Sequence, residues 1–345
     1  MKKIKIAHVG CGRISKNHFE AVKNLKKECE IVAVCDIVPE RAEAAGKENG
    51  VPFFTDYDKM LAEVECDLVV IATPSGLHPE MGVKAAEAGI NVLTEKPMAI
   101  SLEGADSLID ACDKNGVQLF VVKQNRLNTT MQLLKHAIDK GRFGKIYTAY
   151  VNVFWQRPQN YYDMAPWRGT WSLDGGAYMN QASHYIDLLY WLMGDVSEVT
   201  AMTDTLARNI EAEDAGSAVF RFANGALGGV NVTMLTYPKN IEGSVAILGE
   251  KGTVKIGGMA LNKVEHWEFS DYHDDDKFIE QSNYTPPNVY GFGHHAYYSN
   301  VFAAMRGEKA PDTDGRTGRK SLEIILAIYK SAKEKCFVQL PLVKS

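Results

Sequence analysis

The chain has 345 residues, of which 46% are hydrophobic and 23% are charged, and its formal net charge is −5. This length is comfortable for two domains, and the composition is that of an ordinary soluble globular protein. The negative net charge argues against nucleic acid or an anionic membrane as a partner.

No apolar run approaches the roughly 20 residues that a membrane-spanning helix needs. The basic start of the chain passes directly into a strand pattern, without the apolar core of a signal segment, so we expect a cytoplasmic protein. None of the six cysteines forms a C-x-x-C pair, and five fall in the first third of the chain. This usage indicates reduced thiols rather than a disulfide framework, and the sequence predicts no metal site.

Short apolar runs alternate with helical patterns over the first 122 residues. The runs lie at residues 5–9, 31–35, 68–72, 91–93 and 117–122, and the helical patterns at residues 13–27, 40–49, 79–88 and 102–115. Continuous apolar strands alternating with helices are typical of an α/β domain whose parallel sheet is covered on both faces. We therefore predict a first domain at residues 1–122.

A glycine-rich turn follows the first predicted strand. Gly10 allows a tight turn, and Gly12 lets the backbone approach a pyrophosphate. The following helix, which Arg13 and Ile14 introduce, offers free N–H groups and a partial positive charge to that anion. The third position of the G-x-G-x-x-G pattern is Ser15 rather than Gly or Ala, so the match is imperfect.

The next predicted strand ends in Asp36. A carboxylate at this point can accept hydrogen bonds from the adenosine ribose, and it repels a 2′-phosphate. No arginine follows it that would favour NADP, because the next residues are Ile37 and Val38. The order of strand, glycine loop, helix, strand and acid therefore predicts a Rossmann site for NAD.

Two further segments follow later strands, at residues 72–78 and 94–97. In an open α/β sheet, ligands bind outside the carboxyl ends of the strands. A lysine at position 96 can hydrogen-bond a substrate hydroxyl and stabilise the alkoxide that forms as a hydride leaves, although a surface lysine is an equal alternative on this segment alone. The predicted cofactor contacts in the two segments are Thr73, Pro74, Ser75, His78, Glu95, Lys96 and Pro97.

The pattern changes after residue 122, where longer strands alternate apolar with polar residues. They lie at residues 147–155, 196–207, 215–222 and 226–237, and Asn224-Gly225 is a strong hairpin signal. We predict a second, α+β domain at residues 123–345, with an open and mostly antiparallel sheet. Helices at residues 175–192, 295–306 and 316–334 would cover one face, and the acidic residues 271–276 would form a solvated loop.

The glycine loop, Asp36, residues 73–78 and the Glu95-Lys96-Pro97 turn together resemble the Gfo/Idh/MocA oxidoreductases. The resemblance implies a Rossmann domain joined to an α/β domain with an open sheet. It also implies that Glu95 touches the nicotinamide ribose, that Lys96 lies by the reacting carbon, and that Pro97 follows a cis peptide bond.

The second catalytic motif of that family is Asp-x-x-x-His on a helix. Here His184 takes the histidine position, and Asn180 stands where many members have Asp. A spacing of four places both side chains on one helix face, with Asp187 near it. The resemblance implies that His184 is a general base, whereas Asn180 can hydrogen-bond the substrate but cannot relay a proton. Lys96 and His184 are the predicted catalytic residues, and either one is a candidate for the proton acceptor.

Five segments of the second half, at residues 123–128, 152–159, 167–171, 179–187 and 234–240, resemble one branch of the family. Members of that branch oxidise the C3 hydroxyl of UDP-N-acetyl-2-amino-2-deoxy-D-glucuronate, a step in bacterial surface polysaccharide (O-antigen) synthesis. Such a substrate carries a diphosphate, a carboxylate and two kinds of ring, which cations and aromatic side chains recognise.

The residues that fit this substrate follow from the same resemblance. Cations and aromatic residues gather in these segments: Arg126, Arg157, Arg168 and Lys239, with Trp155, Tyr161, Trp167 and Trp171. The predicted substrate contacts are Lys96, Asn125, Arg157, Trp167, Arg168, Asn180, His184, Tyr237 and Lys239, and Gln124 is a further predicted cofactor contact.

Other functions exist on this fold. The alternatives are a dehydrogenase of another sugar or a cyclitol, an NAD-dependent glycosidase, and a non-enzymatic regulator that binds sugar and NAD. A regulator would be expected to lack the Lys or the His, and both are present. Relatives associate through the open sheet, which implies a homo-oligomer, here a tetramer. The sequence leaves open whether NADH is released or is recycled in place with 2-oxoglutarate.

Overall fold

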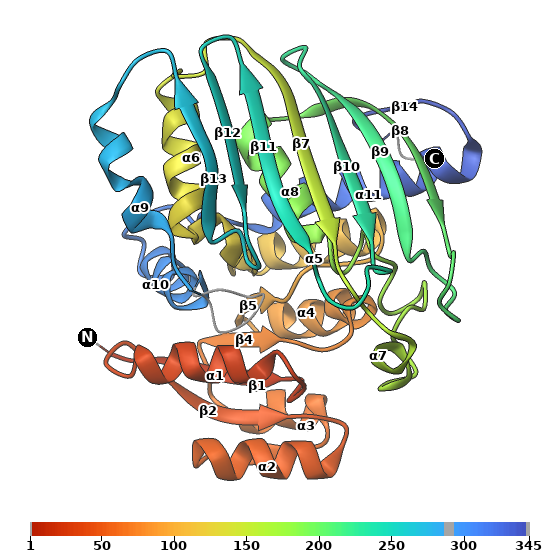
Figure 1. Ribbon diagram of the computed structural model, residues 1–345. Coiled ribbons are helices and arrows are strands. Elements are labelled where there is room, and N and C mark those ends of the chain that lie inside the picture. Colours follow the sequence, from red (N-terminus) through yellow and green to blue (C-terminus); the bar gives the residue numbers. More distant parts are fainter. Residues whose placement is uncertain (1, 286–292, 343–345) are drawn as a thin grey trace. The chain divides into compact units, whose positions relative to one another are not determined.

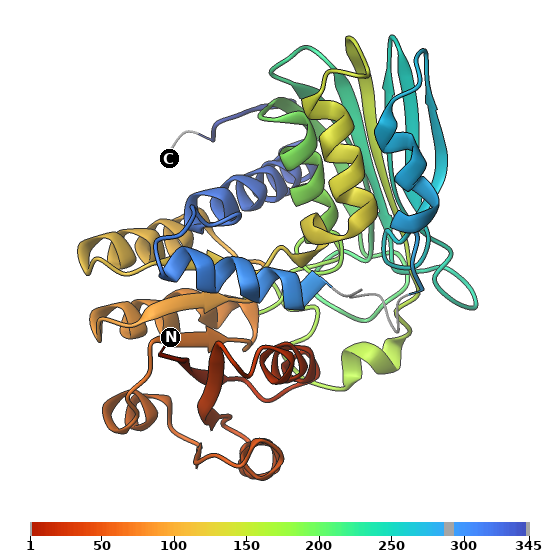
Figure 2. The same cartoon turned by 90° about the vertical axis from the view of Figure 1, so that its left-hand side faces the viewer.

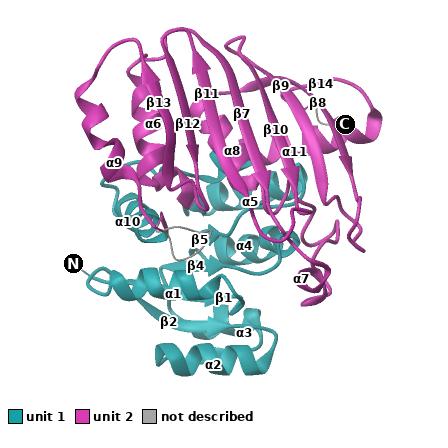
Figure 3. Cartoon of the chain, viewed as in Figure 1, with its two compact units in different colours: residues 1–122, 294–319 teal, residues 123–293, 320–345 magenta. Residues whose placement is uncertain are grey.

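The computed structural model describes residues 2–285 and 293–342. The chain divides into two compact units, residues 1–122 with 294–319 and residues 123–293 with 320–345 (Figure 3). The sequence had suggested one division, between residues 122 and 123, with everything after it in the second domain. Residues 294–319 instead belong to unit 1, because Val121 N donates to Thr313 O and Phe120 forms a β-bridge with Asp314.

Unit 1 contains, in its described residues, a six-stranded sheet with the order β3-β2-β1-β4-β5-β6, in which all pairs are parallel (Figure 1). Its strands are β1 Ile4–Val9, β2 Cys29–Cys35, β3 Phe53–Phe54, β4 Leu68–Ile71, β5 Asn91–Thr94 and β6 Leu119–Val121. Its helices are α1 Ser15–Asn24, α2 Pro39–Asn49, α3 Tyr57–Glu63, η1 Ser75–Leu77, α4 His78–Glu87, α5 Leu102–Lys114 and α10 Gly293–Met305, together with the first turns of α11 Gly315–Glu334.

Burial along the strands explains why this sheet is parallel and enclosed. All four residues of β4 are fully buried. Successive strand residues point to opposite faces, so a strand buried at every position is covered on both sides. The strand order reverses between β1 and β4, which is the point where a doubly wound sheet binds its ligand. The predicted Rossmann domain is confirmed.

Unit 2 contains, in its described residues, an eight-stranded sheet with the order β13-β12-β11-β7-β10-β9-β8-β14. The strands are β7 Ile146–Phe154, β8 Val196–Asp204, β9 Ala215–Phe222, β10 Leu227–Thr233, β11 Glu242–Gly249, β12 Gly252–Gly257, β13 Lys263–Phe269 and β14 Val338–Gln339. The helices are η2 Gln124–Leu127, α6 Thr129–Asp139, α7 Gln159–Asp163, α8 Ser183–Met193, η3 Asp274–Phe278 and α9 Ile279–Ser282, with the rest of α11.

This second sheet is mostly antiparallel, as predicted, and β7 and β10 form its parallel pair. The predicted hairpin is present, with Gly225 at φ +87° between β9 and β10. Helices α6, α8 and α11 lie against one face of the sheet (Figure 2). Along β7, Ala149, Val151 and Val153 are fully buried, whereas Tyr150 on the other face is 42% exposed. None of the described helices combines the length and the hydropathy of a membrane span.

The helix predicted at residues 175–192 begins later, at Ser183. Gly175 has φ +75°, a left-handed conformation that an α-helix does not allow, and the residues up to Ala182 form turns. Asn180 therefore precedes the helix that carries His184, and the prediction that both lie on one helix face is wrong.

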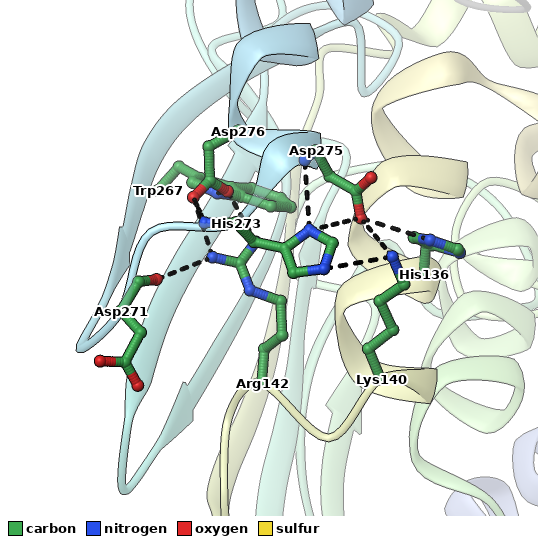
Figure 4. A network of polar contacts seen from close by, with 8 residues as sticks. All are labelled: His136, Lys140, Arg142, Trp267, Asp271, His273, Asp275 and Asp276. Carbon is green, nitrogen blue, oxygen red and sulfur yellow. Dashed lines mark hydrogen bonds and ion pairs between the residues drawn. The ribbon is translucent and has the colours of Figure 1, made fainter.

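The acidic stretch at residues 271–276 is also not simply a solvated loop. Asp276 accepts two hydrogen bonds from the Arg142 guanidinium, at 2.6 and 2.9 Å, and a third from the Trp267 indole, at 2.8 Å (Figure 4). In the neighbouring Asp275, the carboxylate accepts from Lys140 Nζ at 3.1 Å, and the backbone N–H donates to His273 Nδ1 at 3.2 Å. Burial opposes ionisation of Asp276, but its hydrogen bonds outweigh that effect and lower its pKa to about 2.

Replacing Asp276 with Asn should therefore lower the stability of the fold at neutral pH. We expect a loss of about 1 kcal/mol in a urea titration at pH 7, since a charge-assisted bidentate pair is lost from a partly exposed site. Asp276 stays ionised in the folded protein down to about pH 2, but in the unfolded chain it is protonated near its ordinary value of 3.8. The difference should consequently shrink as the pH falls through this range.

The control is the exposed neighbour Asp274, because Asp274→Asn removes a charge from the same turn. Equal stabilities of Asp276→Asn and Asp274→Asn at pH 7 would contradict this role of Asp276.

Candidate cofactor and substrate site

The glycine loop of unit 1 lies where the strand order reverses. Gly10 has φ +92°, and a Cβ built there would lie 2.5 Å from the Ala72 carbonyl oxygen. The fold itself therefore requires glycine at position 10. A Cβ at Gly12 would meet no protein atom within 4 Å, so this position leaves open space beside the loop, as an approaching pyrophosphate needs. Arg13 is exposed and Ile14 half-buried, at the start of α1.

Ser15 has a structural reason to replace the third glycine. Its side chain is buried, and its hydroxyl donates to the Gly12 carbonyl oxygen at 2.6 Å. The hydroxyl thus ties the turn to the first residue of α1. A serine at this position supports the glycine loop, although the sequence alone made it a departure from the pattern.

Asp36 braces the same loop. Its Oδ2 accepts a hydrogen bond from Cys11 N at 2.8 Å, and its Oδ1 accepts one from Val38 N at 2.9 Å. Each carboxylate oxygen retains a lone pair for a further donor, so the side chain can still receive ribose hydroxyls. Ile37 is 86% exposed and offers no cation for a 2′-phosphate.

His78 connects the two later segments of the predicted cofactor site. Its Nδ1 lies 2.8 Å from the Pro97 carbonyl oxygen, and its Nε2 lies 2.9 Å from the Thr73 carbonyl oxygen. Burial lowers the pKa of His78, although both carbonyl contacts oppose that effect. Ser75 is buried at the start of η1, after Pro74. The structure therefore brings the two segments together within unit 1.

Glu95 lies in a buried network that the sequence analysis missed. His18 Nε2 is 3.0 Å from Glu95 Oε1, and His18 Nδ1 is 2.8 Å from the Tyr298 hydroxyl. A neutral His18 with its proton on Nε2 satisfies both contacts, because Tyr298 then donates to Nδ1. His294 Nε2 is 4.0 Å from the same Glu95 oxygen. The only sequence signal was a histidine in the buried stripe of α1, between Ser15 and Val22.

The network keeps Glu95 ionised. Burial opposes its charge, but the hydrogen bond from His18 and the nearby His294 outweigh that effect and hold its pKa well below the usual range. Metal-ligating atoms of these three residues lie within 4.8 Å of one another, and the contacts of His18 account for the group as a hydrogen-bonded network. The second oxygen, Oε2, accepts from Lys96 N at 3.1 Å. The Lys96–Pro97 peptide bond is cis, as the resemblance implied.

In unit 2, His184 is the second residue of α8 and is buried. The Gln124 side-chain nitrogen lies 3.3 Å from His184 Nε2, so these two predicted site residues are brought together. Asn125 is buried beside Gln124 in η2. Gln124 is thus placed to orient the imidazole of His184.

Arg126, a candidate cation for the substrate, instead forms an ion pair with Asp187. Two hydrogen bonds of 2.7 Å join its guanidinium to the carboxylate, and Lys123 Nζ lies 3.6 Å from the same carboxylate. Burial opposes ionisation of Asp187, but Arg126 and Lys123 outweigh it and lower the pKa. Arg126 also stacks on Trp191, 5.7 Å from the ring centre. The group fixes η2 against α8.

Asn180 is held by a buried aspartate. Its side-chain amide donates to Asp174 Oδ1 at 2.5 Å, and Asp174 Oδ2 accepts from Gly169 N at 2.8 Å. Gly169 follows Arg168 directly. One carboxylate therefore links two predicted substrate contacts, Asn180 and Arg168.

Two guanidinium groups share one aromatic ring. Arg157 lies 5.4 Å and Arg168 4.3 Å from the centre of the Tyr161 ring. Trp155 and Trp167 extend the stack, at 5.0 Å from Arg157 and 4.7 Å from Arg168 respectively. Two cations held this close favour an anionic ligand, which guanidinium groups can bind bidentately.

The remaining predicted substrate residues lie on the exposed loop after β10. Tyr237 is 90% exposed, and Lys239 is also exposed. Asn240 Oδ1 accepts from Arg157 Nη1 at 3.3 Å, which ties the loop to the arginine stack. Trp171 lies apart from that stack and packs edge-on against Tyr329, at 5.1 Å between ring centres.

Comparison with known proteins agrees with both halves of this description. Residues 4–123 match the Gfo/Idh/MocA family model described as "oxidoreductase family, NAD-binding Rossmann fold". Residues 135–340 match the model described as "oxidoreductase family, C-terminal alpha/beta domain". The chain belongs to the Gfo/Idh/MocA oxidoreductase family.

Two solved members of this family are especially similar. The chain is 54% identical to the WlbA dehydrogenase of Bordetella pertussis in complex with NADH and UDP-GlcNAcA, over 99% of each chain, with a TM-score of 0.97. It is 53% identical to the WlbA dehydrogenase of Chromobacterium violaceum with the same two ligands, over 100% of this chain and 98% of that one, with a TM-score of 0.96. A curated relative at 26% identity is the D-apiose dehydrogenase of Paraburkholderia graminis, covering 99% of this chain and 90% of that protein.

Replacing Asp187 with Asn should destabilise unit 2 strongly. The substitution leaves the buried Arg126 and Lys123 without their shared anion, which typically costs about 3–5 kcal/mol. Urea unfolding at pH 7 measures the loss. The matched control is Asp195→Asn, whose partner Lys320 lies at the surface, so the loss there should stay within about 1 kcal/mol. Similar unfolding midpoints for the two variants would contradict the assignment.

Proposed function

We propose that this protein is an NAD-dependent dehydrogenase that oxidises the C3 hydroxyl of UDP-N-acetyl-2-amino-2-deoxy-D-glucuronate (UDP-GlcNAcA) to the 3-keto sugar. The observation that carries the proposal is the identity of 54% over 99% of the chain with a WlbA dehydrogenase solved with NADH and this sugar. Within unit 2, the buried His184 beside Gln124 and the stack of Arg157 and Arg168 on Tyr161 are chemically suited to such a reaction.

The residues around the glycine loop fit NAD. The open space beside Gly12 admits a pyrophosphate, and the α1 amino terminus offers it N–H groups. Asp36 is fixed by two backbone donors in a position to receive ribose hydroxyls and to repel a 2′-phosphate. When bound, the nicotinamide accepts a hydride. His18 and Lys96 N hold Glu95, which the family resemblance places at the nicotinamide ribose.

The proposed chemistry at the sugar needs a group that removes the hydroxyl proton. The C3–H hydride would pass to the bound nicotinamide, and the hydroxyl proton would pass to His184 or to Lys96. If His184 takes the proton, a Lys96 ammonium would lower the energy of the developing alkoxide, whereas Lys96 would have to start as the neutral amine to act as the base. Gln124 orients the His184 imidazole, and Asn180, held by Asp174, is available to hydrogen-bond the sugar.

Arg157 and Arg168 would bind the negatively charged groups of the substrate, its carboxylate or diphosphate. Trp167 and the exposed Tyr237 offer aromatic faces for the sugar or the uracil, and Lys239 adds a cation on the same loop as Tyr237. Following the same branch of the family, the proposal includes a cytoplasmic role in the synthesis of lipopolysaccharide O-antigen sugars, in which an aminotransferase would act on the 3-keto product.

The direct test is NADH formation from NAD and UDP-GlcNAcA, followed at 340 nm, with and without 2-oxoglutarate as a hydride acceptor. Lys96→Ala and His184→Ala should each lower kcat by roughly 10²- to 10⁴-fold, the usual contribution of a general base or a positioned charge. The matched control is His266→Ala, an exposed histidine of β13, which should keep full activity.

Several results would overturn the proposal. Absence of both NADH and a 3-keto sugar, by mass spectrometry with the aminotransferase present, would exclude this substrate. Sugar liberated without NADH would indicate a glycosidase, and oxidation of a free sugar or cyclitol alone would indicate that other class of dehydrogenase. Full activity of His184→Ala would assign the proton to Lys96.

We also propose that the protein is a homo-oligomer, a tetramer, that forms through the face of the eight-stranded sheet opposite α8. Tyr150 on β7, Met202 on β8 and Val219 on β9 lie on that face, and Met202 is 82% and Val219 55% exposed. An apolar surface of this kind on a sheet is usually covered by a partner.

Light scattering at micromolar concentration should give about four times the chain mass of 38.2 kDa. The double variant Met202→Glu with Val219→Glu should dissociate the tetramer, because it buries unpaired charges of one sign in the proposed interface. The control, Leu206→Glu, changes an exposed residue outside the strands and should leave the mass unchanged. A monomeric wild-type protein would contradict the proposal.

A further inference from the structure

The segment of residues 175–182, just before α8, has no regular structure, and its backbone is held by one buried and one half-buried residue from elsewhere in unit 2. Glu213 lies just before β9, and Tyr329 lies on α11. Neither residue belongs to the predicted catalytic or binding set. Together they accept hydrogen bonds from the backbone amides of four consecutive residues, Gly176, Ala177, Tyr178 and Met179.

Tyr329 uses the whole hydrogen-bonding capacity of its hydroxyl. The oxygen accepts from Met179 N at 3.1 Å and from Gly176 N at 3.4 Å, and the O–H donates to Glu213 Oε1 at 2.9 Å. A phenol has one donor and two acceptor sites, and each is filled here. Loss of this one oxygen would therefore leave two backbone amides and a carboxyl oxygen without this partner.

Glu213 completes the arrangement. Its Oε1 also accepts from Tyr178 N at 2.8 Å, and its main-chain oxygen accepts from Ala177 N at 3.0 Å. A Cβ at Gly176 would lie 1.7 Å from Glu213 Oε2, so only glycine permits this approach. The carboxyl is almost fully buried, and burial raises its pKa to about 7. The two donors to Oε1 oppose this rise, because a hydrogen bond to a carboxyl oxygen stabilises its ionised form.

The segment of residues 175–182 contains Asn180, a predicted substrate contact, and ends where α8 begins. Asn180 N donates to Gly176 O at 2.9 Å, and the Ser183 hydroxyl, at the first residue of α8, donates to Asn180 O at 3.0 Å. His184 is the next residue. A shift of the backbone at Gly176 would therefore move Asn180 and the start of the helix that carries the imidazole.

We propose that Glu213 and Tyr329 are positioning residues for the dehydrogenase reaction, which act by fixing residues 175–182 and thereby place Asn180 and His184. The expected effect on catalysis rests on the proposed function, whereas the expected effect on the backbone of residues 175–182 does not. Neither side chain touches the reacting atoms. Their effect should fall on kcat and on the sugar KM. It should largely spare the KM for NAD, because all predicted NAD contacts except Gln124 lie on unit 1.

The first measurement is hydrogen exchange in the free protein, which needs no substrate. Tyr329→Phe should accelerate exchange of the Gly176 and Met179 amides, and the matched control Tyr147→Phe, an exposed tyrosine near the start of β7, should not. Unchanged exchange in Tyr329→Phe would overturn the inference, whatever the activity.

The second measurement is steady-state kinetics. Tyr329→Phe and Glu213→Ala should lower kcat/KM for the sugar by about 10- to 100-fold, the size of effect that a displacement of about 1 Å produces. The KM for NAD should change less than about two-fold. Glu213→Gln should restore most of the activity, because its side-chain carbonyl can accept from the same two donors.

Equal losses in Glu213→Gln and Glu213→Ala, or a parallel rise in the KM for NAD, would overturn the positioning role. If Glu213→Ala does not fold, Tyr329→Phe and Glu213→Gln still decide the question. If the wild-type protein does not oxidise UDP-GlcNAcA, the proposed function fails, whereas the exchange measurement still tests the hold on the segment.

Discussion

The close approach of the Gly10 backbone to the Ala72 carbonyl oxygen is the constraint on which the first unit depends. No Cβ fits at 2.5 Å from that oxygen, so the loop after β1 and the chain leaving β4 meet only because position 10 is glycine. This contact brings the carboxyl ends of β1 and β4 to the same edge of the parallel sheet. Asp36 and His78 then fix the turns around that edge through backbone hydrogen bonds, and Glu95 does so from the next strand. A cofactor site built in this way is rigid before any ligand arrives, which lowers the entropy lost on binding.

In the second unit, side-chain hydrogen bonds and ion pairs hold the candidate site residues in place. Its candidate site residues lie on turns and at a helix start, and three buried carboxyl groups hold them. Asp187 is ionised between two cations, Asp174 receives the Asn180 amide, and Glu213, whose pKa is near 7, binds the segment before α8. Two nearby cations lower the pKa of Asp187, whereas burial raises that of Glu213. The predicted substrate contacts of this unit are thus held by groups outside the predicted binding set.

Local signals in the sequence predicted much of this molecule. Apolar runs located the parallel strands of unit 1 except the short β3, and the Asn224-Gly225 pair located a hairpin. The glycine loop with Asp36 indicated the dinucleotide-binding domain. The misses share a physical origin in contacts between distant residues. Helical periodicity could not reveal that Gly175 adopts a positive φ, so Asn180 was placed on a helix that begins three residues later. The partners of Glu95 are 77 residues away at His18 and still farther at His294, and no spacing rule joins them. Asp276 was expected to lie in a solvated loop, but it forms an ion pair with Arg142. Arg126 was expected to bind the substrate, but it forms an ion pair with Asp187. Both partners are remote in the chain.

The double role of Asp36 limits how the cofactor preference could be re-engineered. Protein engineers who wish to admit a phosphorylated cofactor usually remove the acid at this position and add a cation after it. Here the same carboxylate holds Cys11 N and Val38 N, so its removal would also release the glycine loop and the turn after β2. Each lost hydrogen bond weakens the loop by about 1 kcal/mol. A redesigned enzyme would therefore need a substitute acceptor for the Cys11 amide before an added arginine at position 37 could improve recognition.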